Sequence, residues 1–184
     1  MKLFMIMLGC RPKGRFTEQH DIFFGIAKSL KSLIPDIKAF WPEAKGQIHI
    51  DVWREVTSVD GYSIEVIQKI NNSESENQLF FINLGGYKEN EFEEFHYKIL
   101  SVAKTIGEAT KKSKETSFYK HCGFKKATSH IDDKFGIDVD DIYNVKEILE
   151  LDLKENFELV ITKSTSKLTE DKLNIGYLKL EKIL

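Results

Sequence analysis

The chain has few of the residues that define several special classes of protein. Of its 184 residues only 2 are cysteine, 3 are proline and 11 are glycine. Two cysteines cannot build the disulfide framework of a small secreted domain, and so little proline and glycine excludes fibrous or low-complexity chains. No apolar run approaches the roughly 20 residues of a membrane-spanning helix. We therefore expect a soluble globular protein in the cytoplasm, with no membrane partner.

Charge of one sign is also scarce, because the formal net charge is −2. No overall field attracts nucleic acid, so we expect no nucleic-acid partner. The charges are uneven: residues 111–126 hold six lysines and one glutamate, and residues 132–158 hold ten acids and three lysines. Such stretches are typical of solvated faces. The acid-rich stretch leaves open a protein–protein interaction module that meets a basic partner, and the oligomeric state is not determined.

Sequence motifs for common cofactors are missing. The chain contains no G-x-G-x-x-G, no G-x-x-x-x-G-K, no H-E-x-x-H and no C-x-x-C. These patterns would indicate a binding site for a dinucleotide, a nucleoside triphosphate or zinc. No cofactor is therefore identified, and it stays open whether the protein is an enzyme.

An internal repeat is the most informative feature that is present. The run LFMIMLG at 3–9 returns as LFFINLG at 79–85, which is 76 residues later. At the same offset Phe16, Glu18 and His20 match Phe92, Glu94 and His96; after a short insertion His49 and Asp51 match His130 and Asp132, and Asp60 and Tyr62 match Asp141 and Tyr143. This order and spacing indicate duplication of one unit. The first run therefore predicts a buried strand rather than a short export signal, since its twin lies in mid-chain.

The expected fold follows from reading each unit along the chain. Continuous apolar runs predict strands buried on both faces, and the glycines after them permit sharp turns. Apolar spacing of three and four residues predicts helices over 18–33 and 92–112, started by Thr17 and Asn90. IHIDVWREV and YSIEVI predict a strand hairpin. We expect an α/β (α+β) body in which two pseudo-symmetric β-α-β(β) units share a mixed sheet; a ferredoxin-like arrangement is the alternative.

The expected organisation is one globular body with three parts. A first β-α-β-β unit covers residues 1–70, and the homologous second unit covers residues 79–149. Residues 150–184 contain FELVITK and IGYLKLEKI, which predict a C-terminal strand hairpin.

Four segments resemble a known family. MLGCRPKGRFTEQHD, VDGYSIEV, NLGGYKENEFEEFH and FYKHCGFKKATSHIDDKFGIDVDDIYNV are similar to the bacterial family catalogued as domain of unknown function 1543, present here as tandem copies. The resemblance covers about 150 residues, from Lys2 to Leu149. It implies a small soluble bacterial protein and supplies no activity, cofactor or catalytic residue. The family's pattern leads us to expect glycine where Cys10 stands, so a required thiol there is disfavoured.

The polar residues shared by the two units are the candidate site. Helical spacing places His20 on the side of Phe23 and Ala27, so we expect the imidazoles of His20 and His96 to point inward. A structural network of histidine, carboxylate and tyrosine is one explanation. The preferred function is binding of a small anionic ligand, since Arg11 and Arg15 lie in a loop expected to lead to a helix N-terminus. The proposed ligand-binding set is Arg11, Arg15, Glu18, His20, His49, Asp51, Asp60, Tyr62, Glu94, His96, His130, Asp132, Asp141 and Tyr143.

A metal-dependent hydrolase is the alternative from a different class. Imidazole and carboxylate groups hold zinc, iron or manganese. The two candidate trios are His20, His49 and Asp51, and His96, His130 and Asp132. Glu18 is excluded from the first trio, because residues two apart on a helix point about 200° apart. A third possibility is a thiol nucleophile at Cys10 with a lowered pKa.

Overall fold

The structure, a computed structural model, describes residues 1–69, 75–87, 90–115 and 137–183. The chain divides into two compact units: unit 1 contains Met1–Ser73 and Leu149–Leu184, and unit 2 contains Glu74–Ile148. Sheets and short helices occur together, so the predicted α+β class is confirmed. Within the described ranges every strand pair is antiparallel, whereas we expected a mixed sheet. No helix of the described residues has the length and apolar character to cross a membrane.

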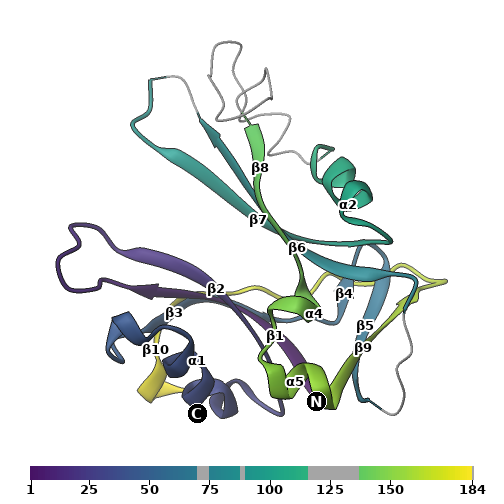
Figure 1. Ribbon diagram of the computed structural model, residues 1–184, viewed down its shortest axis with the longest axis horizontal. Coiled ribbons are helices and arrows are strands. Elements are labelled where there is room, and N and C mark those ends of the chain that lie inside the picture. The colour runs from purple at the N-terminus through teal and green to yellow at the C-terminus, as the bar shows by residue number, and fades with distance from the viewer. Residues whose placement is uncertain (70–74, 88–89, 116–136, 184) are drawn as a thin grey trace. The chain divides into compact units, whose positions relative to one another are not determined.

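Unit 1 contains two sheets and several short helices (Figure 1). Its elements are β1 (Lys2–Cys10), β2 (Gln19–Ala27), η1 (Leu30–Leu33), α1 (Ile34–Phe40), η2 (Pro42–Ala44), β3 (His49–Glu55), β4 (Ser58–Val59), β5 (Tyr62–Gln68), α5 (Leu151–Asn156), β9 (Phe157–Lys163), β10 (Asn174–Lys179) and η3 (Leu180–Lys182). The larger sheet has the order β10-β3-β1-β2, and the smaller has the order β4-β5-β9.

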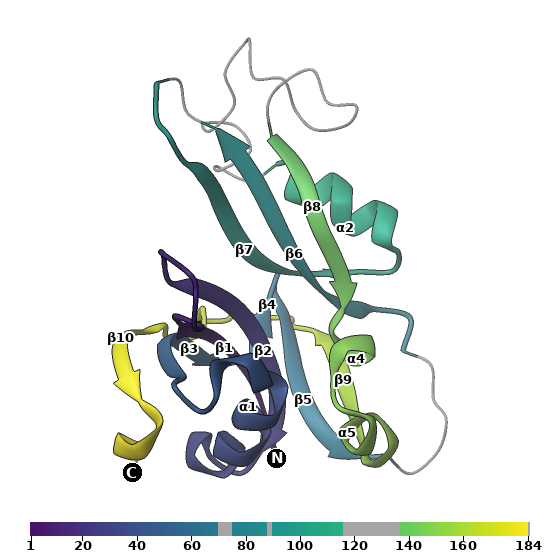
Figure 2. The same cartoon turned by 60° about the vertical axis from the view of Figure 1, so that its left-hand side comes forward.

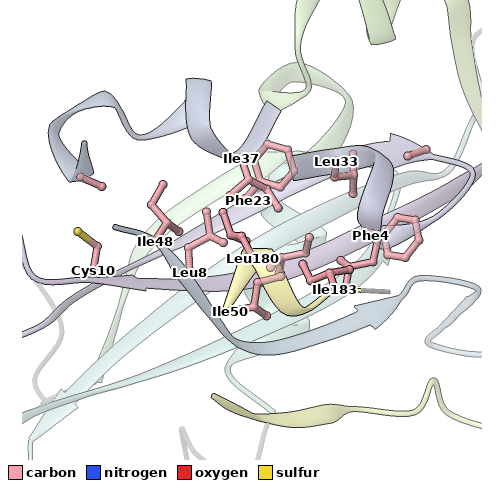
Figure 3. Packing of buried hydrophobic residues seen from close by; sticks show 14 residues of the cluster. Phe4, Leu8, Cys10, Phe23, Leu33, Ile37, Ile48, Ile50, Leu180 and Ile183 are labelled. Carbon is pink, nitrogen blue, oxygen red and sulfur yellow. The ribbon is translucent and has the colours of Figure 1, made fainter. Parts of the chain in front are cut away.

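The core of unit 1 lies between the larger sheet and the helix α1. Alternate residues of β1, among them Phe4, Ile6 and Leu8, are buried in one cluster with Leu33 and Ile37 (Figure 3). Each such fully buried side chain contributes about 1.5–3 kcal/mol to folding. The even-numbered residues of β1 therefore face the helix, and the odd-numbered residues face the other side of the sheet.

The smaller sheet begins with a two-residue hairpin. Asp60 and Gly61 connect β4 to β5 and have φ values of 53° and 78°. Positive φ at both positions belongs to the type I′ turn, for which Asp-Gly is a favoured sequence. β5 then pairs with β9 along its whole length. The expected hairpin between IHIDVWREV and YSIEVI is therefore wrong, since β3 pairs with β1 and β10 instead.

Unit 2 is a three-stranded sheet with the order β7-β6-β8 and a helix packed on it (Figure 2). Its elements are β6 (Gln78–Tyr87), β7 (Glu94–Ala103), α2 (Ile106–Ser113), β8 (Ile137–Asn144) and α4 (Val145–Ile148). Thr105 caps α2, because its hydroxyl accepts a hydrogen bond from the Glu108 backbone N–H at 3.2 Å. Ala109 on this helix is fully buried against Phe80, Ile82 and Leu84 of β6.

The first strands of the two units have the same pairing pattern. Gly9 of β1 pairs with His20 on one side and His49 on the other. Gly85 of β6 pairs with His96 and Asp138. A β-bulge lies just before each glycine, at Met7/Leu8 in unit 1 and at Asn83/Leu84 in unit 2, again 76 residues apart. Duplication of one unit stays a prediction, and the register that the two units share is what such a duplication would produce.

The two long predicted helices are wrong. Residues 18–33 contain β2 followed by the 3-10 helix η1, and residues 92–112 contain β7 followed by α2. Thr17 and Asn90 therefore precede strands rather than helices. The run from Ile22 to Ala27 is almost entirely apolar and buried on both faces, so no strand alternation shows. Each unit thus starts with an antiparallel hairpin, and the expected β-α-β crossover does not form.

The two C-terminal strands also differ from expectation. β9 pairs with β5, and β10 pairs with β3, so they belong to different sheets rather than to one hairpin. Asp171 precedes β10 and accepts hydrogen bonds from the backbone N–H groups of Thr57 and Ser58, at 2.9 and 3.3 Å. This carboxylate holds together the two places where the chain passes between the sheets of unit 1.

Candidate functional site

Four polar side chains meet on the face of the larger sheet that lies opposite α1. We call Glu18, His20, His49 and Asp51 the His/carboxylate cluster. His49 Nε2 is 3.2 Å from Glu18 Oε1 and 3.3 Å from Asp51 Oδ1. His20 Nε2 is 3.6 Å from Glu18 Oε2 and 3.3 Å from Asp51 Oδ2. Both carboxylates therefore lie against both imidazoles, each through its two oxygens.

Strand geometry brings these four residues together. Residues directly opposite in an antiparallel sheet point to the same face, and so do residues two apart on one strand. His20 and His49 both pair with Gly9, on opposite sides of β1. Asp51 lies two residues after His49 on β3, at the bulge where the register with β1 skips it, and Glu18 lies in the loop directly before β2, two residues before His20. Glu18 therefore lies beside His20, whereas its exclusion from the metal trio assumed that the two residues point apart on a helix.

Gly9 provides the space that the cluster occupies. A Cβ atom at this position would lie 2.3 Å from His49 Nε2 and 2.6 Å from Asp51 Oδ2. Real Cβ contacts are never so short, so any side chain here would displace the imidazole and the carboxylate. From the sequence Gly9 was expected only to permit a turn. Its place within the sheet shows that it lies directly beneath the imidazole of His49 and the carboxylate of Asp51.

The inner part of the cluster is buried and incompletely satisfied. The His49 side chain is 8% exposed and that of Asp51 is 24% exposed, whereas Glu18 and His20 are 46% and 41% exposed. Among the described residues, His49 Nε2 and Asp51 Oδ2 find no hydrogen-bond partner, although both atoms are buried. An unsatisfied buried polar atom costs about 1–3 kcal/mol. The expectation that the imidazoles of His20 and His96 point inward is wrong, since His20 is at the solvent side and His96 is exposed on β7.

Tyr177 is a member of the site that the sequence did not suggest. It comes from β10, and its ring lies 4.3 Å from the imidazole ring of His49, centroid to centroid. Tyr177 is 157 positions from His20 in the chain, and β10 has no counterpart in the repeat. The exposed aromatic ring covers one side of His49 and limits how the imidazole can turn.

Cys10 is a core residue rather than a nucleophile. Its side chain belongs to the same buried cluster as Leu8 and Ile48 (Figure 3). Burial raises the pKa of the Cys10 thiol above its ordinary value of 9.0, and the nearby Glu18 carboxylate raises it further. The expectation of a lowered pKa is therefore wrong, because the thiol faces apolar side chains instead of a helix N-terminus.

The two arginines expected to bind an anion are exposed in the loop between β1 and β2. The prediction that Arg11 and Arg15 bind an anion depends on a helix that begins directly after this loop. The loop leads instead to β2, which has no free N-terminal N–H groups of the helical kind. Asp60 and Tyr62 are not members of the cluster either. Asp60 lies in the turn between β4 and β5, and Tyr62 lies on β5 of the smaller sheet.

The remaining predicted residues belong to unit 2. Glu94 and His96 are exposed on β7. Asp141 and Tyr143 lie on β8, where the Tyr143 hydroxyl donates a hydrogen bond of 3.2 Å to the Asp141 carboxylate. His130 and Asp132, and with them the second metal trio, lie outside the described residues. The register pairs Asp141 with Asn83, so its counterpart in unit 1 is Val52 opposite Met7, and not Asp60.

The first metal trio is brought together, but not as a finished metal centre. In the described part of the chain, no three His, Cys, Asp or Glu side chains are placed so that they could hold one metal ion. Each imidazole nitrogen faces a different oxygen of each carboxylate, so the oxygens do not converge on one point. The arrangement provides two imidazoles and two carboxylates at the sheet surface, with one side open to water.

Comparisons with known proteins agree with the fold and are silent on chemistry. Residues 15–66 match the family described as Domain of Unknown Function (DUF1543), which confirms that resemblance for a segment containing the whole cluster. The chain is similar to the crystal structure of the protein Il1583 from Idiomarina loihiensis, with a TM-score of 0.61, 19% identity and 97% of each chain covered. At that identity the similarity shows a shared fold alone. The curated proteins include no match.

Proposed function

We propose that the protein binds a small cation at the His/carboxylate cluster of unit 1. The observation that carries this proposal is the pair of buried atoms, His49 Nε2 and Asp51 Oδ2, which lack a hydrogen-bond partner among the described residues. Folded proteins rarely leave such atoms unsatisfied unless water, an ion or a ligand meets them or the group has a catalytic role. Both atoms border the space above Gly9, where a Cβ would be too close to each of them.

The charge of the cluster decides between a cation and an anion. Glu18 and Asp51 bring two negative charges, and an imidazole in its neutral form adds a lone pair rather than positive charge. A phosphate or carboxylate placed here would meet like charges, whereas a cation would be attracted from both sides. The anionic ligand expected from Arg11 and Arg15 therefore loses its basis, since these exposed side chains have no helix terminus behind them.

Thermal unfolding with small ligands tests this proposal. Parent protein is unfolded with zinc, magnesium, methylammonium, guanidinium, phosphate and acetate salts at equal ionic strength. A ligand that binds only the folded state raises its stability by about 2.7 kcal/mol at 100 times its Kd. We expect at least one cation to raise the melting temperature, and phosphate and acetate to leave it unchanged.

Gly9→Ala is the variant that connects the effect to this place. The added methyl group fills the space beside His49 Nε2, so stabilisation by the cation should disappear. Gly107→Ala is the matched control, because its Cβ would meet only Thr105 Oγ1, at 3.9 Å. If phosphate stabilises the parent more than every cation, or if Gly9→Ala responds like the parent, the proposed function is wrong.

A further inference from the structure

From the cluster's donor atoms we infer that the cation is a divalent transition-metal ion of the zinc type, bound by His20, His49, Asp51 and Glu18. This inference rests on the proposed function, since it names the chemical class of the cation. Imidazole nitrogen is a good ligand for zinc, iron, cobalt and copper, whereas magnesium and calcium prefer oxygen alone. A site for a hard cation would not place two histidines at its centre.

The nitrogen-to-oxygen distances in the cluster are close to those between neighbouring ligand atoms of a tetrahedral metal, although the four contacts use four different carboxylate oxygens. Bonds of about 2.0–2.1 Å to imidazole nitrogen and carboxylate oxygen place neighbouring ligand atoms about 3.3–3.4 Å apart. The imidazole-to-carboxylate separations of 3.2, 3.3, 3.3 and 3.6 Å lie around this value. An ammonium group needs about 2.8 Å to each acceptor and would have to push these side chains apart.

The contacts are not those of a hydrogen-bonded network. His49 Nε2 lies 3.2 and 3.3 Å from two carboxylate oxygens, yet neither contact is a hydrogen bond, and the atom is otherwise buried without a partner. The nitrogen therefore has carboxylates beside it without a hydrogen bond to either. A metal ion bound to the nitrogen would satisfy it and draw the carboxylates to the ion.

To complete the site, the exposed side chains of Glu18 and His20 have to turn. As placed, the four groups do not surround one metal position. His49 is buried beneath the Tyr177 ring, so it is the fixed ligand. Glu18 and His20 are nearly half exposed, so rotation of their side chains can turn one oxygen and one nitrogen toward the metal. Their exposure also leaves one side of the metal open to water or a substrate.

Direct metal binding to the full-length protein tests the inference. Chelator-treated protein is titrated with zinc by calorimetry, and with cobalt while the visible absorption is recorded. We expect saturable zinc binding, a cobalt ligand-field spectrum with nitrogen and oxygen donors, and no displacement by magnesium or calcium at the same concentration. His20→Ala and Glu18→Gln should each weaken zinc binding at the cluster by about 100-fold or more, since even outer-shell changes cost 10- to 100-fold.

Two choices keep the result interpretable. His20 and Glu18 lie at the surface, so their variants should fold where the buried His49→Ala variant fails. His96→Ala, on the strand of unit 2 that corresponds to β2, is the matched control and should retain the parent's cluster binding. Unchanged zinc binding in His20→Ala and Glu18→Gln, or equal competition by calcium, overturns the inference. Stabilisation by methylammonium or guanidinium without zinc binding overturns it too, but leaves the proposed function standing; no response to any cation removes both.

Discussion

Gly9 shows how a single residue without a side chain can determine what its neighbours do. It lies between His20 and His49 in the sheet, and its missing Cβ leaves the space into which the imidazole and Asp51 extend. Cys10, the next residue, points to the opposite face and is buried among apolar side chains. One step along the strand thus separates a polar surface site from the hydrophobic core, because successive side chains of a strand alternate.

The Cys10 thiol predicts a pH dependence of stability. Burial, and then the Glu18 carboxylate, raise its pKa in the folded protein above the ordinary value of 9.0. A raised pKa means that the folded state disfavours the thiolate. The stabilising contribution is therefore complete below about pH 8.5 and is lost as the pH rises through the folded-state pKa. Denaturant unfolding between pH 7 and 10 should show a steeper loss for the parent than for Cys10→Ala.

The reactivity of the same thiol gives an independent measurement. In a Cys122→Ser background, iodoacetamide should modify Cys10 slowly in native protein and quickly in urea, because the folded thiol is 1% exposed and protonated. Modification of the native protein at the rate found in urea would contradict the buried position of Cys10.

At the scale of elements, the two units show how strand and helix compete for the same residues. Ile22, Phe23, Phe24 and Ile26 fit both a helical stripe and a strand buried on two sides. Tertiary pairing makes this segment a strand, because β2 pairs with β1 and α1 packs on one face of the resulting sheet. In unit 2 the helix begins only at Ile106, where Thr105 and Glu108 provide the cap. A Glu or Gln three residues after Ser or Thr was a usable signal for this start.

The Asp171 carboxylate is predicted to stabilise unit 1 by linking the segment before β10 to the segment before β4. Its carboxylate accepts hydrogen bonds from the Thr57 and Ser58 backbone N–H groups, which lie more than a hundred residues earlier. Asp171→Ala should lower the free energy of unfolding by about 1–3 kcal/mol, since two N–H donors lose a charged acceptor. For a domain of this size 1 kcal/mol corresponds to about 2–4 °C in Tm. Glu170→Ala, at the exposed neighbouring position, is the control and should melt like the parent.

At the scale of the whole molecule, unit 2 is inserted into unit 1. The chain leaves unit 1 after β5 and returns to it before α5. The two ends of unit 1 lie near each other there, because the Lys69 backbone N–H donates to the Asn156 carbonyl at 2.9 Å. Unit 1 has its own core, and the His/carboxylate cluster is built entirely from unit 1 strands and the loop before β2.

Excision of unit 2 tests this organisation. Leu149 and Asn156 are seven residues apart, and the last six residues of this stretch form α5, so a Gly/Ser linker of about six residues, which spans up to about 20 Å, can join Lys69 to Leu149. We expect the shortened chain to unfold cooperatively and to keep the cation response of the parent. Dispersed NMR amide signals and a sigmoidal melt would support this outcome; a molten chain would show that unit 1 depends on unit 2.

Local sequence established the features that depend on neighbouring residues alone. The apolar runs at 3–9 and 79–85 are buried strands, and the segment around the cluster resembles a known family. The residue types of the cluster were also visible. Tertiary structure decided that residues 19–27 form a strand, that Gly9 separates two histidines, and that Tyr177 covers one of them. Strand pairing joins residues far apart in the chain, and the energy of burying both faces of β2 exists only once its partners are in place.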